Sequence, residues 1–402
     1  MQVVDDPERI ERAAWNALVD VDAEANPFLR HEYLAALTAS GAAAAASGWQ
    51  PRFLLLTRGG ELAAAAPRYV KDHSYGEYVF DWSWAEAYQR HGLVYYPKSL
   101  VAVPFTPVPG TRLLARDEHG RRALAAALLA EARAEGLSSL HVLLAPPRDL
   151  DALAAAGMVL RDTVQFHWRN AGYADFEAFL AQLEQPKRKK IRAERRKVRE
   201  AGVTLERRVG RDIGEADWRF FFRCYLATYR AHFSSPYLSL DFFLRIAAAM
   251  PEQLMLVLAR RDGKPVASAL GVFDDRRAPP RLYGRYWGAL ERIDCLHFEC
   301  CYYQMIEFAI ERGLAWFEGG AQGAHKLARG LDPVAARSAH WLAHPAMMAA
   351  VTRYVDRERA GVAAAIDELN EHRAFRDDGL PLMREGHAPV APAKTRGEFG
   401  RR

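Results

Sequence analysis

The sequence predicts an α/β (α+β) protein built by tandem duplication of one unit, a mixed sheet flanked by helices. Three features recur along the 402 residues: a strand–turn–strand pair, a helix closed by glycine and followed by a strand, and a strand rich in aromatic residues. Each feature occurs once in either half of the chain. Because strand and helix signals alternate in this way, two copies of one mixed unit account for the repeat.

The strand–turn–strand pair comes first in each copy. Residues 52–70 (RFLLLTRGGELAAAAPRYV) contain a Gly-Gly turn, and residues 254–273 (LMLVLARRDGKPVASALGVF) contain an Asp-Gly turn. Both dipeptides tolerate the positive φ angles that tight hairpin turns require. We therefore expect a β-hairpin at each place.

The helix-and-strand feature follows later in each copy. One amphipathic run ends at Gly136 before the strand SSLHVLL, and another ends at Gly313 before the strand LAWFE. Glycine is favoured just past a helix end because it adopts the left-handed conformation without a steric clash. Aromatic strands at 163–168 and 338–343 complete the two copies.

The repeat divides the chain into a first half, residues 1–170, and a second half, residues 171–385. A length of 402 residues agrees with about two domains. The last residues, 386–402, are rich in Pro, Gly and charge and have no periodicity, so we expect a disordered tail.

Composition excludes several classes of protein. The four cysteines form no C-x-x-C pair, so neither a disulfide framework nor a zinc site is predicted, and the expected chemistry needs no metal. No apolar run approaches the roughly 18 residues of a membrane span, and the acidic N-terminus lacks a signal-peptide core. We expect a reduced, cytoplasmic protein without a membrane span.

The net charge of +5 is concentrated in one predicted helix, residues 186–201. Residues 187–199 (KRKKIRAERRKVR) hold nine cations and one carboxylate, a local charge of +8 that leaves −3 for the rest of the chain. Such a segment favours one local anionic partner, for example tRNA or another polyanion. A solvated helix without a partner is the alternative.

The helix that begins near LHFECCYYQ carries the first candidate chemistry. At helical spacing Glu299 lines up with the apolar residues Tyr303, Ile306 and Ile310. A carboxylate in apolar surroundings is costly unless it is paired or used, and desolvation would make it a stronger base. Glu299 is therefore a candidate general base, and a salt bridge to an arginine is the structural alternative. His297 lies in the first turn, where a helix N-terminus can also receive an anion.

A glycine-rich loop, EGGAQGAHKLARG at residues 318–330, forms the second candidate site. It lacks the spacing of a phosphate-binding P-loop, but glycines let backbone N–H groups approach a ligand, and the cations suit phosphate or carboxylate. A turn with solvated charges is the alternative. The candidate ligand-binding residues are Gly320, Gln322, Gly323, His325, Lys326 and Arg329.

The two copies differ at these positions. Aligning the two helix-ending glycines places Arg122 opposite Glu299, and Gly120 opposite His297. The prolines of LLAPPRD stand where the second half has its glycine-rich loop. We therefore expect the first half to be catalytically silent.

An aromatic segment distinguishes the first half. Residues 69–96 contain nine aromatic residues in 28 positions. Tyr75, Trp82 and Trp84 could line a pocket for a sugar or peptide acceptor, or the segment could form an aromatic interface between the halves. The sequence leaves both interpretations open.

Several long stretches resemble the FemAB-like proteins of the GNAT (N-acetyltransferase-like) superfamily, the group associated with peptidoglycan biosynthesis or recognition. They are NPFLRHEYL, HSYGEYVFDWSWAEAY, YYPKSLVAVPFTPVPGTRLL, KRKKIRAERRKV, LHFECCYYQMIEFAIERGL and FEGGAQGAHKLARG. The resemblance implies a tandem GNAT-like fold whose central strands splay apart, and transfer of an acyl or aminoacyl group to an amine. The implied donor is acyl-CoA or aminoacyl-tRNA.

Two positions depart from the family pattern. Ala324 stands where a glutamate is expected in GAQGEHK, and YWGALERIDCLHF replaces the usual R/Q-x-x-G-x-G/A signature for CoA. The second departure weakens the acyl-CoA interpretation.

The resemblance thus implies an N-acyltransferase, and the residues above suggest where its chemistry would lie. In the expected mechanism Glu299 accepts a proton from the acceptor amine with help from His297, Tyr302 or backbone N–H groups stabilise the oxyanion, and Lys326 and Arg329 hold phosphates. The alternative function is a non-catalytic module that recognises a cell-wall precursor, a glycan or a nucleic acid.

Overall fold

The computed structural model describes residues 1–321 and 323–376 of the chain. The predicted disordered tail, residues 386–402, and the candidate site residue Gln322 lie outside the described residues.

The two predicted hairpins are confirmed. Strands β3 (Phe53–Arg58) and β4 (Glu61–Ala66) are antiparallel, as are β11 (Leu254–Arg261) and β12 (Lys264–Asp274). The turn residues Gly59, Gly60, Asp262 and Gly263 all have positive φ angles, between 52° and 85°. The Gly-Gly and Asp-Gly dipeptides thus supply the backbone conformation that two-residue hairpins need.

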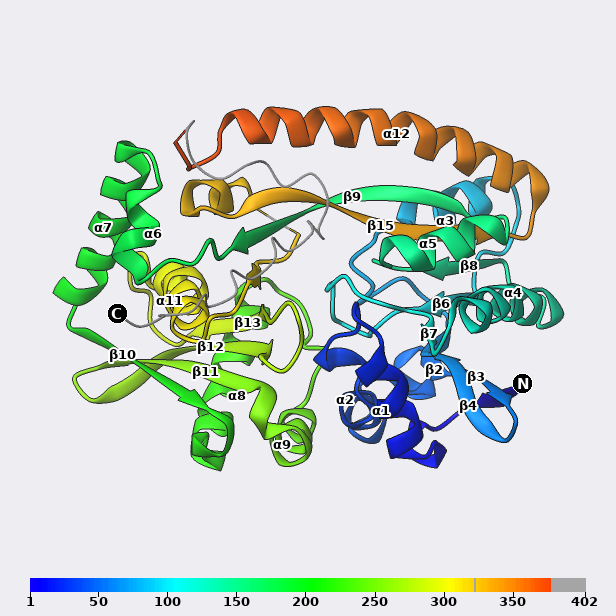
Figure 1. The fold of residues 1–402 in the computed structure, drawn as a ribbon, viewed down its shortest axis with the longest axis horizontal. Coiled ribbons are helices and arrows are strands. Elements are labelled where there is room, and N and C mark those ends of the chain that lie inside the picture. The colour runs from blue at the N-terminus through cyan, green and yellow to red at the C-terminus, as the bar shows by residue number, and fades with distance from the viewer. Residues whose placement is uncertain (322, 377–402) are drawn as a thin grey trace, which may run out of the picture.

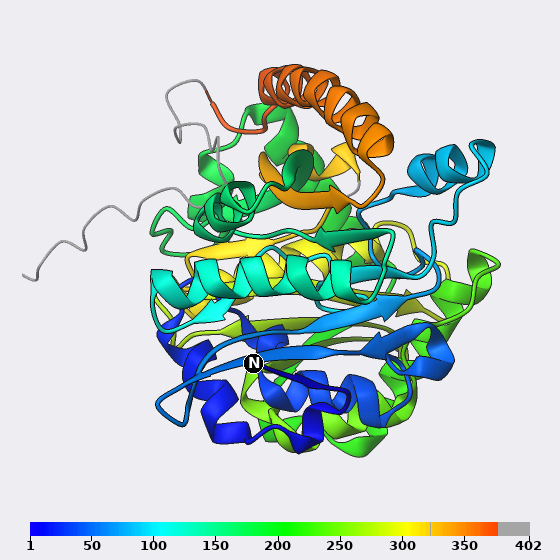
Figure 2. The same ribbon diagram turned by 90° about the vertical axis from the view of Figure 1, so that its right-hand side faces the viewer.

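The first half continues with further short strands and helices. In chain order these elements are β1 (Gln2–Val4), α1 (Arg12–Val21), α2 (His31–Ala39), β2 (Trp49–Pro51), β5 (Arg68–Lys71), α3 (Trp82–Arg90), β6 (Lys98–Val101), β7 (Leu114–Ala115), α4 (Glu118–Ala134), β8 (Ser139–Val142), α5 (Pro147–Ala155) and β9 (Val159–Arg169). α4 packs across β3 and β4 of the first half (Figure 2).

The second half begins with the helices α6 and α7 and ends with a long helix. Its elements are α6 (Phe176–Ala181), α7 (Gln185–Glu200), β10 (Val203–Val209), α8 (Glu215–Ala231), α9 (Leu240–Ala249), β13 (Arg281–Ala289), α10 (Leu296–Phe298), a π-helical segment (Glu299–Tyr303), α11 (Gln304–Glu311), β14 (Trp316–Glu318), a 3-10 helix (Ala324–Arg329), β15 (Asp332–Leu342) and α12 (Pro345–Glu371). Within residues 1–321 and 323–376, no helix combines the length and apolar composition needed to cross a membrane.

The sheets show the duplication directly. A four-stranded sheet has the order β1-β3-β4-β7, and an eleven-stranded sheet has the order β10-β11-β12-β13-β14-β9-β15-β8-β6-β5-β2. Among the described residues, each half contains one parallel pair, β6 with β8 and β13 with β14, and each pair is joined by a helix that ends at a glycine of positive φ. Those glycines are Gly136 and Gly313, as the sequence predicts.

The two halves exchange their last strands. β9 pairs with β14 at its C-terminal end and with β15 along most of its length, while β15 continues onto β8. These two long strands lie side by side beneath α12 (Figure 1). One sheet therefore runs without interruption through both halves.

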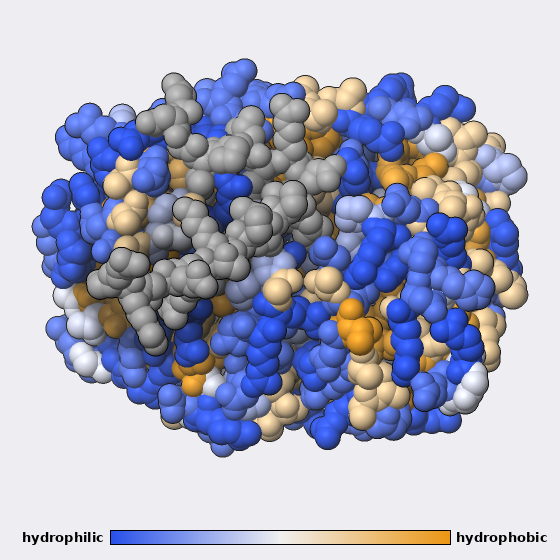
Figure 3. Space-filling model, viewed as in Figure 1, coloured by the Kyte–Doolittle hydropathy of each residue, from blue (hydrophilic) through white to orange (hydrophobic). Residues whose placement is uncertain are grey.

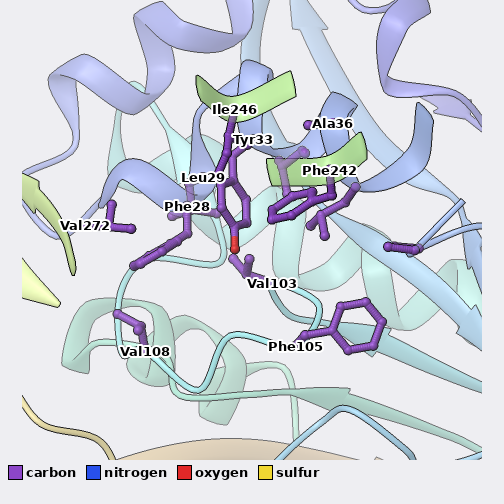
Figure 4. Close-up of a cluster of buried hydrophobic side chains, with 14 of the residues drawn as sticks. Phe28, Leu29, Tyr33, Ala36, Val103, Phe105, Val108, Phe242, Ile246 and Val272 are labelled. Atoms are coloured by element: carbon purple, nitrogen blue, oxygen red, sulfur yellow. The ribbon is translucent and has the colours of Figure 1, made fainter. Parts of the chain in front are cut away.

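A common core also joins the halves. Phe28 and Tyr33 of the first half pack among Phe242 and Ile246 of α9 (Figure 4). The rings of Tyr33 and Phe242 lie 5.3 Å apart, edge to face. Because burial of apolar surface is the main stabilising term, this shared core holds the two halves together.

Gly288 of β13 marks a close approach of α8 to the sheet. A Cβ atom at Gly288 would lie 1.8 Å from the carbonyl oxygen of Cys224.

We expect Gly288→Ala to lower the free energy of unfolding by about 1–3 kcal/mol, because the added methyl forces the backbone of α8 to move. The measurement is the midpoint of urea unfolding. Gly361→Ala is the control: it lies within α12 with no atom within 4 Å, and alanine should raise stability there by about 0.5–1 kcal/mol.

Candidate active site

A cavity opens where β13 and β14 diverge. The two strands pair in parallel only over Arg281–Tyr283 and Trp316–Glu318; beyond these residues β13 continues, whereas β14 gives way to the glycine-rich loop. The resulting space, here called the central cavity, has a volume of about 670 Å³. It is lined by Tyr78, Pro107, Tyr225, Thr228, Tyr229, His232, Ser234, Ala269, Leu270, Gly284, Arg285, Tyr286, Trp287, His297, Cys301, Tyr302, Met305, Phe317 and Gly319.

The central cavity reaches both faces of the sheet. Tyr225 and Tyr229 come from α8, which packs with the core on one face of β11 and β12. Tyr302 and Met305 come from the helix after β13, which packs with the alternate residues of the same strands and therefore on the other face. In Figure 1 α11 lies above these strands and α8 and α9 lie below them. Residues from both faces of the sheet thus surround one gap between the strands.

A β-bulge sets the wall of the cavity on β13. Gly271 of β12 pairs with Gly284, and Ala269 pairs with Trp287, so Leu270 alone stands opposite both Arg285 and Tyr286. A bulge breaks the alternation of side chains and re-aims them. Arg285 and Tyr286 accordingly both pack on the α8 side of the sheet, beside the core of the first half.

The helix that carries Glu299 contains a π-helical segment, and this changes where Glu299 points. In a regular α-helix Glu299 would lie over Tyr303, but the wider π turn rotates it by about one residue. Gln304, five residues on, donates from Nε2 to Glu299 Oε1 at 2.9 Å. Glu299 thus joins the polar stripe of the helix, and the apolar surroundings predicted for it are corrected.

Glu299 is bound by an arginine of the basic helix. Arg195 of α7 donates from Nε and Nη2 to the two oxygens of Glu299, both at 3.1 Å, and from Nη1 to Glu307 at 2.9 Å. Glu299 is buried, with 3% of the residue exposed, and it does not line the central cavity. The geometry therefore supports the structural alternative, a salt bridge, and gives no support to a general base at Glu299.

We expect Glu299→Gln to act on stability and to leave catalysis largely intact. Loss of the charge removes the bidentate pair, and we expect the free energy of unfolding to fall by about 1–3 kcal/mol, because Arg195 keeps Glu307 as a partner. Turnover should fall by far less than the roughly 100-fold that loss of a general base brings. The free energy of unfolding in denaturant and kcat are measured for Glu299→Gln and for the control Glu200→Gln, which changes an exposed residue of α7. A large loss of kcat with unchanged stability would return Glu299 to the role of base.

Three of the predicted residues, His297, Tyr302 and His325, form a cluster. The hydroxyl of Tyr302 and Nε2 of His325 are 3.1 Å apart, and the ring centroids of His297 and Tyr302 are 5.7 Å apart. His297 and Tyr302 line the central cavity, whereas His325 is exposed at its margin. The candidate catalytic groups are therefore concentrated at this end of the cavity.

Burial sets the protonation of this cluster. Desolvation, with smaller contributions from the charges of His325, Arg329 and Lys326, lowers the pKa of His297 to about 4. Desolvation raises the pKa of Tyr302 well above its usual range and lowers that of His325. Near neutral pH His297 is thus an unprotonated imidazole that can accept a proton, and Tyr302 is a neutral hydroxyl that can donate one.

The two cations of the glycine-rich loop, Lys326 and Arg329, both bond to other groups of the protein. Burial lowers the pKa of Lys326 to about 8, and its Nζ donates to the carbonyl of Gly320 at 3.1 Å. Arg329 donates to both oxygens of Glu194 at 2.9 Å and lies 3.4 Å above the ring of Phe298. Both side chains are buried and fix the loop, so this geometry gives no support to their predicted role as phosphate ligands, which stays a prediction.

The backbone of the loop also has a defined conformation. Gly320 and Gly323 have φ angles of 83° and 100°, which favour glycine at both positions. The ring of His325 fills the place of a Cβ on Gly323. Gly319, which the sequence interpretation did not select, lies in the cavity wall.

The aromatic segment of the first half does not form one pocket. Tyr75 and Trp82 are exposed and touch each other with ring centroids 5.0 Å apart. Trp84 is buried against α12, lies 4.9 Å from the ring of His340 and does not line the central cavity, which favours the alternative of an aromatic interface for this residue. Tyr78, between them in sequence, does line the central cavity.

The basic helix α7 has two different faces. Its inner face carries Ile191, Glu194 and Val198, which are buried against the second half. The outer face carries exposed cations, and hydrophilic residues cover this edge of the molecule, at the left of Figure 3. The cations of the outer face that form no ion pair with described residues are Lys187, Lys189, Lys190, Lys197 and Arg199.

Sequence reasoning missed much of the cavity wall. Arg285, Tyr286 and Trp287 lie in the run RLYGRYWGA, and Tyr225 and Tyr229 lie in the aromatic helix α8. Two glycines that flank an Arg-Tyr-Trp run within a strand are the available signal, since glycine in a strand often marks a bulge or a close approach.

Comparison with known proteins gives a family and a set of similar folds. A family model described as FemAB-like, peptidoglycan biosynthesis/recognition, matches residues 6–377. No curated protein sequence matches the chain.

Three solved structures share the fold over most of both chains. L-PGS from Bacillus licheniformis has a TM-score of 0.54 at 10% identity, covering 88% of this chain and 99% of its own. FemX has a TM-score of 0.53 at 13% identity, covering 85% and 97%. The C-terminal DUF2156 domain of a putative lysylphosphatidylglycerol synthetase from Agrobacterium fabrum has a TM-score of 0.53 at 12% identity, covering 85% and 96%. With the duplicated parallel pairs, these similarities confirm the predicted tandem GNAT-like fold.

Proposed function

We propose that this chain, which belongs to the FemAB-like family of peptidoglycan biosynthesis/recognition proteins, is an acyltransferase that moves an acyl or aminoacyl group to an amine. The observation that carries the proposal is the central cavity, which lies at the divergence of β13 and β14 and is lined by residues from both faces of the sheet. A transferase of this kind must bring a donor carbonyl and an acceptor amine together out of water. The first half lacks the corresponding residues and acts as a wall of the site.

The proposed reaction is direct transfer. The amine nitrogen attacks the donor carbonyl carbon, so that a C–N bond forms and the bond from that carbon to the leaving sulfur or oxygen breaks. His297 accepts the proton that the amine loses, and Tyr302 donates its hydroxyl proton to the leaving group. His325, hydrogen-bonded to Tyr302, replaces that proton from solvent.

The open edge of β13 supplies the proposed oxyanion donors. β14 pairs with β13 only up to Tyr283, so in the described structure the backbone of residues 284–289 has no partner strand on that side. Backbone N–H groups fixed in a strand can donate to the developing negative oxygen without reorganising. Of the two oxyanion donors first expected, Tyr302 or backbone N–H groups, we thus keep the backbone groups and assign Tyr302 to the leaving group.

We propose two candidate donors, acyl-CoA and aminoacyl-tRNA, and both are made in the cytoplasm, where we propose that the protein acts. The gap between two diverging strands suits the extended arm of an acyl-CoA. The unpaired cations on α7 favour an aminoacyl-tRNA, because phosphate neutralisation by such cations drives binding to nucleic acid. In either case the acceptor is a small-molecule, peptide or amino-sugar amine.

A binding and transfer experiment tests the proposal. Acetyl-CoA, a longer acyl-CoA and a charged tRNA are each titrated into the protein, and thermal stabilisation is followed by mass spectrometry of amine probes for an acylated product. Binding of tRNA to the wild-type protein should fall steeply with added salt. The double variant Lys189→Glu/Lys190→Glu should bind tRNA more weakly and with a shallower salt dependence, and CoA binding should be unchanged. Binding without any acyl product would favour a recognition module, and no saturable binding by any donor would refute the proposed transfer.

A further inference from the structure

Arg285 is distinct among the residues of the central cavity. Of the described residues that line it, Arg285 alone bears a permanent charge; most of the others are aromatic or apolar, and the rest are neutral polar groups, a cysteine and histidines. Arg285 stands on the bulge of β13, on the α8 side of the sheet, close to Tyr286. A single guanidinium in an aromatic pocket is a recognised arrangement for holding an anionic group.

This guanidinium has no counter-ion in the described part of the protein. Nη2 donates to the carbonyl of Phe105 at 2.8 Å and lies 3.2 Å from the hydroxyl of Tyr286, but the buried Nε–H has no acceptor. The rings of Phe28 and Tyr286 lie 5.3 and 4.9 Å from the guanidinium carbon. Aromatic faces and one carbonyl offset only part of the cost of removing a cation from water.

The position of Arg285 is rigid. The carbonyl of Phe105 accepts from both Arg285 and Tyr286, the latter at 3.0 Å. Phe105 has a positive φ of 58°, its N–H donates to Gly76, and its ring stacks on Tyr237 at 4.8 Å. The first half therefore holds the arginine in place before any ligand arrives, which is how specific binding sites are preorganised.

We propose that Arg285 binds a carboxylate of the acceptor, so that the substrate is an amine that also carries a carboxylate and an apolar or aromatic group. This inference rests on the proposed transfer function and names the substrate class of the same cavity. The apolar part of the acceptor lies against Tyr225 and Tyr229, and its amine reaches through the gap towards His297, whose ring is 5.2 Å from that of Trp287.

The balance of charge favours a carboxylate over a phosphate. One permanent cation lines the described wall of the cavity, and His297 is neutral near pH 7. A carboxylate carries one negative charge, whereas a phosphate monoester carries close to two and is usually held by several donors or cations. Lys326 and Arg329, whose charges act on His297, are committed to Gly320 and Glu194.

Equilibrium binding tests the inference without any donor or turnover. Isothermal titration calorimetry compares L-phenylalanine and glycyl-L-phenylalanine with their C-terminal amides, and phenyl phosphate forms a third arm. We expect each acid to bind the wild-type protein about 10- to 100-fold more tightly than its amide, because only the acid pairs with the guanidinium. Arg285→Gln should remove this preference, and Arg285→Lys should retain part of it.

Each outcome decides the question. Equal affinity of acid and amide, or no measurable affinity for either acid, would overturn the inference, and tighter binding of phenyl phosphate would assign Arg285 to a phosphate instead. The comparison of acid with amide uses the wild-type protein, so it stands even where Arg285→Gln does not fold. Failure of every acyl donor in the transfer assay would refute the proposed function while leaving a positive acid-over-amide result in place.

Discussion

Replacing His297 by glutamine is expected to lower kcat by about 100- to 10,000-fold, the range for loss of a general base. His297 lines the central cavity, lies 5.2 Å from Trp287 between ring centroids, and has no described carboxylate partner that would hold it protonated. Burial lowers its pKa to about 4. The imidazole is therefore already unprotonated at neutral pH, and glutamine preserves its size and polarity but cannot accept the proton.

The pH profile gives an independent check. Because the protonated form of His297 accumulates only as pH falls towards its pKa of about 4, its contribution to kcat should be constant near neutrality and lost on the acid side. The measurement is single-turnover transfer with the donor that the binding screen identifies, across pH, in wild type and variant. His119→Gln, an exposed histidine on α4 of the first half, is the control and should behave as wild type. Wild-type turnover in His297→Gln would remove His297 from the reaction.

Local signals in the sequence predicted the repeating parts of the fold. Each of these signals depends on a few adjacent residues, so it can be predicted without knowledge of the tertiary structure. They are the Gly-Gly and Asp-Gly turns and the helix-ending glycines Gly136 and Gly313. The exchange of β9 and β15 could not be predicted, because it pairs residues far apart in the chain. No local pattern specifies which strand of one half lies beside the other half.

The candidate site also has parts that the sequence predicted and parts that it did not. The sequence located the helix with His297 and Tyr302 and the glycine-rich loop, and the fold does bring them together. It misplaced Glu299, because a regular period of 3.6 residues was assumed where the helix has a π turn. The composition of the loop indicated a site but not the direction of each side chain, so the burial of Lys326 and Arg329 and their bonds to Gly320 and Glu194 could not be predicted.

Tyr302→Phe is expected to lower the rate of transfer by about 100-fold or more when the leaving group is a hydroxyl, as in aminoacyl-tRNA. The tyrosine hydroxyl lies 3.1 Å from Nε2 of His325, and burial keeps it protonated. An alkoxide is a poor leaving group and depends on a proton donor, whereas a thiolate, with its lower proton affinity, leaves without one more readily. The loss should therefore be smaller with an acyl-CoA donor, and the ratio of the two losses reports what Tyr302 does.

This ratio separates catalysis from structure. Removing one hydroxyl from a buried ring can loosen the helix that carries it, but a packing defect would slow both donors equally, since both react in the same cavity. Tyr354→Phe, on the exposed face of α12, provides the control for loss of a tyrosine hydroxyl. His325→Gln should reproduce part of the effect, because it removes the partner that holds and reloads the hydroxyl of Tyr302. Equal losses with both donors would assign Tyr302 to the packing of the cavity, and the leaving group would then take its proton from water.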